Sequence, residues 1–385
     1  MTINHTEILT ILESHDPNTE LSALIQLRQR YIESIMELEN PGKTKDLISI
    51  ARNFEELVKL NEEELNLRYL RKKYPDFKFK LEDGDIHAVL KSYLGKTLPE
   101  FPAGLKRLNI MHCPNLGSVP EFPDTLECLE IQNCSNLEII PNFPSRLENL
   151  YIWKVPNIEN IAELPEGLEV LSIDECINIE TIPEFPSSLK KLKIKFCDKL
   201  EALPEFPAGL MSLDITLCEN LEIVPEFQPG LKELVVSRCE NLKTLPEFPA
   251  GLKNLHIKDC ENLKKVPELS SNLVRLVIEK CEKLTSLPTL PPGLKLLFLD
   301  CQNIESIAEL PEGLEVLNFK WCLNLETIPE FPSSLNSLDI LFCKRLTNIP
   351  DFPSGLEILS IRACDDLNQE TLDRIEEFNK KQSCL

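Results

Sequence analysis

Cysteine is the residue type with the most chemistry to offer in this sequence, because a thiolate serves as a nucleophile, a metal ligand or a disulfide partner. The chain has 385 residues and 14 cysteines. Twelve of them recur at a nearly constant spacing of 21 residues: Cys113, Cys134, Cys176, Cys197, Cys218, Cys239, Cys260, Cys281, Cys301, Cys322, Cys343 and Cys364. Val155 occupies the one place in this series without a cysteine, and the step from Cys281 to Cys301 is one residue short. A fixed period of this length predicts a solenoid of stacked repeats.

The surroundings of these thiols do not favour catalysis or metal binding. A reactive cysteine needs a neighbouring base or cation, and a metal site needs further ligands at short spacing. The sequence has five histidines, none at such a spacing, and it has no HExxH, CxxC, GxxxxGK(S/T) or GxGxxG motif. We therefore expect reduced thiols that act as small buried hydrophobes in a reducing compartment, with no catalytic residue, no metal and no cofactor.

The cysteines belong to a repeated apolar pattern, LxxLxIxxCxxL, first seen from Leu105 to Leu116. The pattern occurs thirteen times, with copies that begin at Leu105, Leu126, Leu147, Leu168, Leu189, Leu210, Leu231, Leu252, Leu273, Leu294, Leu314, Leu335 and Leu356. This is the leucine-rich-repeat pattern in its cysteine form. The alternation around Leu108 and Ile110 predicts a short strand with one buried face. Stacking of successive copies predicts a parallel sheet on the concave side.

The segments between the strands carry pairs of prolines in the pattern PEFP, as at Pro183 and Pro186. Each proline fixes φ and removes a donor, so we expect extended or polyproline II connections on the convex side. Phenylalanines between the prolines should fill the core from that side: Phe101, Phe122, Phe185, Phe206 and Phe248. The predicted fold class is α/β: a leucine-rich-repeat solenoid with a concave parallel sheet, an extended convex side and an α-helical N-terminal cap.

Three regions are expected along the chain. They are a helical N-terminal cap or docking region at 1–97, a solenoid of thirteen repeats at 98–366, and a C-terminal capping helix and tail at 367–385. The apolar patterns and breakers of the first region predict helices over about 6–14, 19–39 and 44–73, a strand at 77–81 and a helix over 85–94. At the other end, Leu372, Ile375 and Phe378 should lie on the inner face of a helix that starts near Asn368.

The charge of the chain restricts its partners and its location. The net charge is −22, of which residues 1–97 carry −3 and the remaining residues carry −19. Nucleic acid is disfavoured as a partner, since phosphate binding needs a basic surface. No apolar run approaches the ~20 residues of a membrane span, and the first residues lack the features of a secretory signal. We expect a cytoplasmic protein, or one delivered into the cytosol of a host cell.

The variable positions of the strands are the candidates for binding. The residues two, four and six places after the first leucine of each copy should point over the concave face, and they vary while the framework stays constant. One strand presents three lysines in an acidic protein, and several present aromatic residues, which are typical interface anchors. Solvated lysines and partly buried tryptophans are the alternative interpretation. The candidate partner-binding residues are Tyr151, Trp153, Lys191, Lys193, Lys195, Asp214, His256, Phe298, Lys320 and Trp321.

Two blocks of the sequence are near copies of each other. The segment 157–171 differs from 303–317 at one position, and the match continues from 180–189 to 326–335. Between the matching segments, the residues at predicted concave positions have changed almost completely. Lys191, Lys193 and Lys195 correspond to Ser337, Asp339 and Leu341. Both drift at tolerant positions and selection for different contacts explain this divergence.

The repeats resemble those of the LPX-type leucine-rich-repeat effectors that Gram-negative pathogens inject into host cells, the group that contains YopM and the IpaH and SspH ubiquitin ligases. The resemblance covers about residues 98–366 and is carried by Leu-Pro-x-x-Pro-x-x-Leu-x-x-Leu frames at 98–108, 203–213 and 245–255. That family usually has asparagine in place of the cysteine and a repeat about one residue shorter. The Cys-x-x-Leu form is more similar to plant intracellular immune receptors. No segment after Cys364 is long enough for a ligase domain, so the resemblance implies a YopM-like scaffold that binds host proteins.

We therefore expect a non-enzymatic scaffold for protein–protein interaction, effector-like in character, that binds host or intracellular proteins on its concave face. No membrane, nucleic acid or small-molecule substrate is expected. One alternative is an adaptor of the ubiquitin system that recruits an enzyme through the helices of residues 1–97. A second is a sensor similar to immune receptors, which the absence of a nucleotide-binding loop disfavours.

Overall fold

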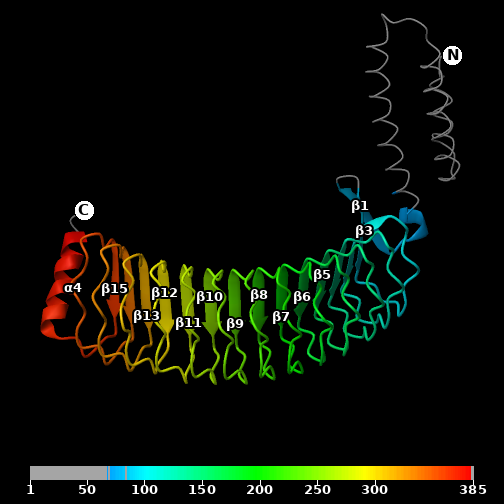
Figure 1. Ribbon diagram of the computed structural model, residues 1–385. Helices are drawn as coiled ribbons and strands as arrows, with labels where there is room; N and C mark the ends of the chain where they lie inside the picture. Colours follow the sequence, from blue (N-terminus) through cyan, green and yellow to red (C-terminus); the bar gives the residue numbers. More distant parts are fainter. Residues whose placement is uncertain (1–66, 68–69, 83–84, 383–385) are drawn as a thin grey trace, which may run out of the picture.

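The computed structural model describes residues 67, 70–82 and 85–382 (Figure 1). Its elements are β1 (Phe77–Glu82), β2 (Asp85–Lys91), β3 (Leu105–Met111), β4 (Cys128–Gln132), β5 (Asn149–Trp153), β6 (Val170–Asp174), β7 (Lys191–Lys195), β8 (Ser212–Thr216), β9 (Glu233–Ser237), β10 (Asn254–Lys258), β11 (Arg275–Glu279), β12 (Leu296–Asp300), β13 (Val316–Lys320), β14 (Ser337–Leu341), β15 (Ile358–Arg362) and α4 (Gln369–Gln382).

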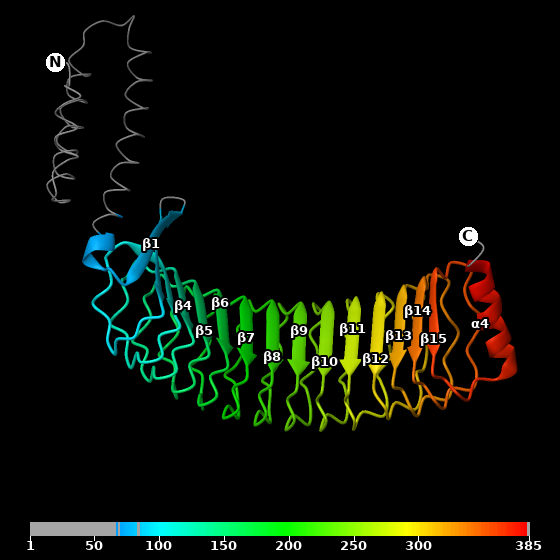
Figure 2. The same ribbon diagram turned by 180° about the vertical axis from the view of Figure 1, so that it is seen from behind.

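All of these strands form one sheet in the order of the sequence. β1 pairs antiparallel with β2, and the pairing is parallel from β2 onward, with β3 to β15 supplied by the thirteen repeats. Figure 2 shows the strands side by side along a curved body, with α4 at the end away from β1. The predicted leucine-rich-repeat solenoid is confirmed.

Each short strand has one face in the core, as its alternating sequence predicts. In β6, Leu171 and Ile173 are fully buried, while Ser172 and Asp174 are half-buried on the other face. Parallel pairing places Leu171 beside Leu192 of β7, and the same match recurs along the sheet. The leucines and isoleucines therefore form one continuous core that no single repeat could complete.

The cysteines of the series lie inside this core. Every one except Cys364 is buried, and Val155 is buried in the equivalent place. The Cys176 thiol donates to the carbonyl of Asp174 at 3.5 Å and to that of Ile152 at 3.9 Å. Burial raises the pKa of Cys176 to about 12. Such a thiol is a packing group rather than a nucleophile.

Phenylalanines fill the core opposite the sheet, as the PEFP pattern predicts. They stack in runs with ring centroids 5.8–6.5 Å apart: Phe101 with Phe122 and Phe143, Phe185 with Phe206, Phe227 and Phe248, and Phe331 with Phe352. The runs are interrupted where leucine holds the equivalent position, as at Leu164 and Leu269. The connections between the strands contain no helix, which agrees with the expected extended convex side.

A left-handed residue follows each strand in twelve of the thirteen repeats. It directly precedes the buried cysteine or Val155 and has φ between 47° and 58°, although it is never glycine. Its N–H extends the sheet ladder, as when Glu175 donates to the carbonyl of Lys195 at 3.0 Å. The exception is the short repeat, where Cys301 follows Asp300 directly. The residue missing from the 20-residue step is therefore the left-handed one.

The N-terminal end differs in one element from the sequence prediction. The strand at 77–81 is confirmed as β1, but the segment from Asp85, predicted as a helix, is strand β2. Ala88 and Leu90 are buried at a period of two, and β2 pairs along β3, so sheet extension decides the conformation. Residues 67 and 70–73 are helical; the other helices expected in 1–66 lie outside the described residues.

α4 covers the C-terminal end of the solenoid, as expected. Asn368 caps it, because its Oδ1 accepts from the N–H of Thr371 at 2.9 Å. Ile375 and Phe378 pack against the core. The expected inward position of Leu372 is wrong: its side chain is 44% exposed, and Thr371 is buried instead. The cap fixes the rotation of the helix and brings the polar residue inward.

Candidate protein-binding surface

The concave face consists of the second, fourth and sixth residues after the first leucine of each repeat, as predicted. In β5 these are Asn149, Tyr151 and Trp153, which alternate with the buried Leu150 and Ile152. Strand spacing of about 4.8 Å brings equivalent positions of neighbouring repeats into contact range. Side-chain identity along these rows therefore decides what the face can bind.

Tyr151 and Trp153 form the first aromatic group of this face. They are 37% and 38% exposed, and they line a hollow of about 400 Å³ together with Glu130, Ser172, Asp174 and Lys193. The indole N–H of Trp153 donates to Glu175 at 3.2 Å. The ammonium of Lys154 lies 5.1 Å from the ring centroid. These two contacts position the indole ring, and 38% of the Trp153 surface stays exposed.

Asp174 adds a desolvated carboxylate to this hollow. Burial raises the pKa of Asp174, and the nearby Lys193 opposes the rise. The Lys193 ammonium lies 3.8 Å from Oδ2 of Asp174. The other oxygen, Oδ1, is buried and finds no hydrogen-bond donor within the described residues. A donor from a partner would satisfy this acceptor.

The lysines of β7 do not act as a free trio. Lys193 pairs with Asp174, and Lys195 pairs with Asp214 at 2.8 Å. Asp214 also accepts from the hydroxyl of Thr216 at 2.7 Å. Only Lys191 has no side-chain partner among the described residues. Two of the three positive charges are thus balanced within the sheet.

His256 is also held by neighbours on the concave face. Its Nε2 lies 3.0 Å from Glu279, and the ammonium of Lys258 lies 3.1 Å from the other oxygen of the same carboxylate. These three side chains form a closed polar cluster on β10 and β11. The sequence prediction placed His256 correctly on the concave face, but its ring already contacts Glu279.

A second aromatic group lies on β12 to β14. The Lys320 ammonium is 5.1 Å from the centroid of Phe298 and 3.5 Å from Asp339. Trp321 is 42% exposed and stacks on Phe342 with ring centroids 4.1 Å apart and planes at 14°. Both stacked residues have left-handed backbones, with φ of 52° and 58°.

Sequence reasoning missed Phe342 because it lies just beyond the strand. The signal was available, since the residue before each cysteine is a fixed place in the repeat, and Phe196 and Trp321 also occupy it. The structure brings Lys320 over Phe298 and stacks Trp321 on Phe342. It keeps them apart from Tyr151 and Trp153, because strands β6 to β11 lie between the two groups.

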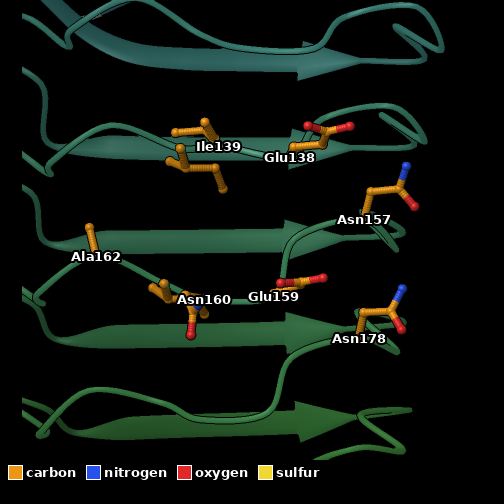
Figure 3. Close-up of a pocket in the computed structure, with 9 residues that line it drawn as sticks. Glu138, Ile139, Asn157, Glu159, Asn160, Ala162 and Asn178 are labelled. Carbon is orange, nitrogen blue, oxygen red and sulfur yellow. The ribbon is translucent and has the colours of Figure 1, made fainter.

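A larger hollow lies away from the concave face. It has a volume of about 620 Å³ and is formed by the connections that follow β4, β5 and β6 (Figure 3). Glu138, Glu159 and three asparagines line it beside the exposed Ile139. Ala162 occupies the place that the first proline of PEFP has in many repeats. Its smaller side chain leaves space for the hollow. None of the predicted binding residues lines this hollow.

No metal site or membrane-spanning helix accompanies these features in the part of the chain that the structure describes. Clusters of three or more His, Cys, Asp or Glu side chains able to hold a metal ion are not found there. Over the same residues, no helix has the length and apolar composition needed to cross a bilayer.

The repeats, the parallel sheet and the variable concave rows define this protein as a leucine-rich-repeat solenoid. Its structure is similar to that of YopM, a leucine-rich effector protein from Yersinia pestis, with 26% identity and a TM-score of 0.53 over 72% of this chain and 88% of that chain. YopM from Yersinia enterocolitica WA-314 matches with 21% identity and a TM-score of 0.33, covering 73% of this chain and 90% of that one. The leucine-rich repeat domain of the type III effector XopL matches with 15% identity and a TM-score of 0.30, covering 94% and 97%.

The first of these structures confirms the expected resemblance in repeat and fold to leucine-rich-repeat effectors. No protein-family model matches the chain, and no curated protein matches its sequence.

Proposed function

We propose that this protein is a non-enzymatic scaffold that binds protein partners on its concave face. The observation that carries the proposal is the stacked pair of Trp321 and Phe342, which borders the concave rows directly after β13 and β14. These two large aromatic residues, one exposed and one half-buried, lie on left-handed backbone. A left-handed conformation costs a residue with a Cβ about 1–2 kcal/mol. Other repeats hold charged or small residues at this place, such as Lys154 and Ala363, so the turn itself does not require an aromatic side chain.

The composition of the face supports this proposal. Interface hot spots are enriched in tryptophan, tyrosine and arginine, and both aromatic groups contain a tryptophan beside charged residues. A specific interface needs about 800 Å² on each side, and thirteen strands at about 4.8 Å spacing offer more than that. YopM is described as an effector protein, and an effector-like role inside a reducing compartment agrees with thiols buried as packing groups.

Capture with matched variants tests the proposal. The full chain is immobilised, and bound proteins from a host-cell lysate are quantified for the wild type, for Tyr151→Ala with Trp153→Ala, and for Phe298→Ala with Trp321→Ala and Phe342→Ala. The control removes two apolar side chains outside the concave face, Ile139→Ala with Ile223→Ala, which are 65% and 68% exposed.

The wild type and the control should retain the same partner, and at least one aromatic variant should lose it by about thirtyfold, as expected for a hot spot of about 2 kcal/mol. A partner that both aromatic variants retain and the control loses would refute binding on the concave face.

A further inference from the structure

A run of basic side chains lies where strands β7 to β12 begin. It occupies the position directly after the first leucine of each repeat and the next position along. Charged residues at these two positions in the six repeats are Lys190, Lys191, Lys232, Glu233, Lys253, Arg275 and Lys295, of which all but Glu233 are basic. This concentration contrasts with the net charge of −22 of the chain. It is separate from both aromatic groups.

The same position changes sign on either side of this run. It holds Glu127, Glu148 and Glu169 in the repeats before it, and Glu315 in the repeat after it. Ion pairs form where the signs meet: Lys190 pairs with Glu169, and Lys295 pairs with Glu315 at 2.7 Å. The lysines at the two ends of the basic run, Lys190 and Lys295, are therefore paired with carboxylates. The cations between them are not paired in the described part of the chain.

Four cations in the middle have no side-chain partner among the described residues. They are Lys191, Lys232, Lys253 and Arg275, all exposed, and we name them the basic edge. Lysines deeper on the concave face behave differently, since Lys195 and Lys258 both have carboxylate partners. Lys232 and Lys253 hold equivalent places on neighbouring strands, where like charges are destabilising, and neither of them has an ion pair within the described ranges to offset this.

We propose that the basic edge binds an extended acidic segment of a protein partner, which runs across the strands. This inference rests on the proposed function. The basic edge runs from Lys191 of β7 to Arg275 of β11, and four strand intervals of about 4.8 Å give a row of about 19 Å, the length of about six extended residues. Met211 and Val274 occupy the same row with 36% and 39% of their surfaces exposed. They provide apolar contacts between the cations, so the matching segment alternates acidic residues with occasional apolar ones.

A protein segment fits this surface better than a nucleic acid. The row is short and ends in glutamates on one side and a neutralised pair on the other, so a long polyanion would continue onto acidic surface. The two positions that form the row hold no aromatic side chain in these six repeats. Single-stranded nucleic acids bind through such stacking surfaces.

The test uses fluorescence anisotropy with the full chain and a labelled eight-residue peptide of six glutamates and two leucines. The edge variant reverses the four cations: Lys191→Glu, Lys232→Glu, Lys253→Glu and Arg275→Glu. The control variant makes the same change of net charge at four exposed lysines outside the strands: Lys243→Glu, Lys264→Glu, Lys265→Glu and Lys344→Glu. A lysine counterpart of the peptide and an eight-nucleotide oligouridine complete the set of probes.

The acidic peptide should bind the wild type and the control with affinities within about threefold of each other. The edge variant should bind it at least about thirtyfold more weakly, because each exposed pair lost changes affinity about two- to threefold. Binding to the wild type should also weaken in high salt. Equal binding by the edge and control variants, no binding by the wild type, or tighter binding of oligouridine would each overturn the proposal.

The aromatic variants separate this inference from the proposed function. They leave the basic edge intact, so they should bind the acidic peptide like the wild type. If the peptide fails to bind while a captured partner still depends on Trp153 or Trp321, the scaffold function stands and the acidic docking segment is refuted.

Discussion

Trp321 provides a direct test of the left-handed turn, because its backbone and its side chain affect stability with opposite signs. Its φ is 52°, and its ring stacks on Phe342 at 4.1 Å. Trp321→Ala removes the stacked ring but keeps a Cβ on left-handed backbone. Trp321→Gly removes the ring and relieves the backbone as well. The comparison of the two variants therefore isolates the cost of the backbone conformation.

The magnitudes decide the sign of this comparison. The left-handed conformation costs a residue with a Cβ about 1–2 kcal/mol. Glycine loses about 0.4–1 kcal/mol relative to alanine through the entropy of the unfolded chain. Trp321→Gly should thus be about 0.5–1 kcal/mol more stable than Trp321→Ala. Loss of the aromatic stack, about 0.5–1.5 kcal/mol, is common to both, so glycine should lie near the wild type and alanine below it.

Urea unfolding followed by circular dichroism measures this difference as a shift of midpoint at constant slope. Ile358 in β15, 60% exposed on extended backbone, is the control, and there glycine should be less stable than alanine by about 0.5–1 kcal/mol. If Trp321→Gly is also less stable than Trp321→Ala, the proposed cost of the left-handed backbone is refuted. Both Trp321 variants should lose the binding that depends on the second aromatic group. The glycine variant should therefore be nearly as stable as the wild type and still fail to bind.

Three further predictions concern the core and its charges. Cys218→Ser should lower the free energy of unfolding by about 1–3 kcal/mol, because it buries a hydroxyl in place of a thiol. Cys218→Val should change it by less than about 1.5 kcal/mol, since Val155 is fully buried in the equivalent place; equal losses in urea unfolding would contradict this. Phe206→Ala should cost about 3–5 kcal/mol, and Phe206→Leu much less, because Leu164 holds the same place in another repeat; the midpoints of thermal unfolding compare them. Burial raises the pKa of Asp300, so the folded state binds this proton more tightly than the unfolded state, and wild-type stability falls as pH rises through the interval above the ordinary aspartate value. Asp300→Asn should therefore raise the Tm at pH 7 and lose this advantage below about pH 4; calorimetry at both pH values checks this, and an undiminished advantage in acid would be inconsistent with it.

The sequence predicts the solenoid well because one physical constraint repeats thirteen times. The strand leucines and the cysteines must be inward for any repeat to stack, so a single pattern determines the strands and the concave positions. Residues 85–91 lie outside that constraint. Their apolar residues fit a short helix or a strand, and pairing with β3 decides between the two.

Three features of the site depend on geometry that the repeat pattern does not determine. The left-handed place before each cysteine holds residues as different as Lys154, Phe196 and Ala363, so no glycine signal marks it. Two residues of the basic edge, Lys232 and Lys253, lie one position before the predicted concave rows, while Lys191 and Arg275 lie in the first of those rows. Pairing of Lys195 with Asp214 depends on strand register, which becomes definite only in the assembled sheet.

Ion pairs in the duplicated blocks show which part of their divergence is internal. Asp174 of β6 pairs with Lys193 at 3.8 Å, and the equivalent residues Lys320 and Asp339 pair at 3.5 Å with the signs exchanged. These four positions are half-buried, where an unpaired charge costs more than at a fully exposed site, so a change of sign at one favours the opposite change at the other. The change at this pair is therefore explained by compensation within the chain, and it requires no partner.

The remaining differences have no such compensation. The pair of Lys195 and Asp214 corresponds to Leu341 and Ser360, which cannot form an ion pair. Glu175 corresponds to Trp321, which places a large apolar ring on left-handed backbone at the surface. These substitutions exchange charge for apolar area where strands β13 and β14 end, and burial in a partner is what would make that exchange favourable. On the proposed binding function, we therefore expect the functional divergence of the two blocks to lie at the Trp321 group rather than across the whole concave face.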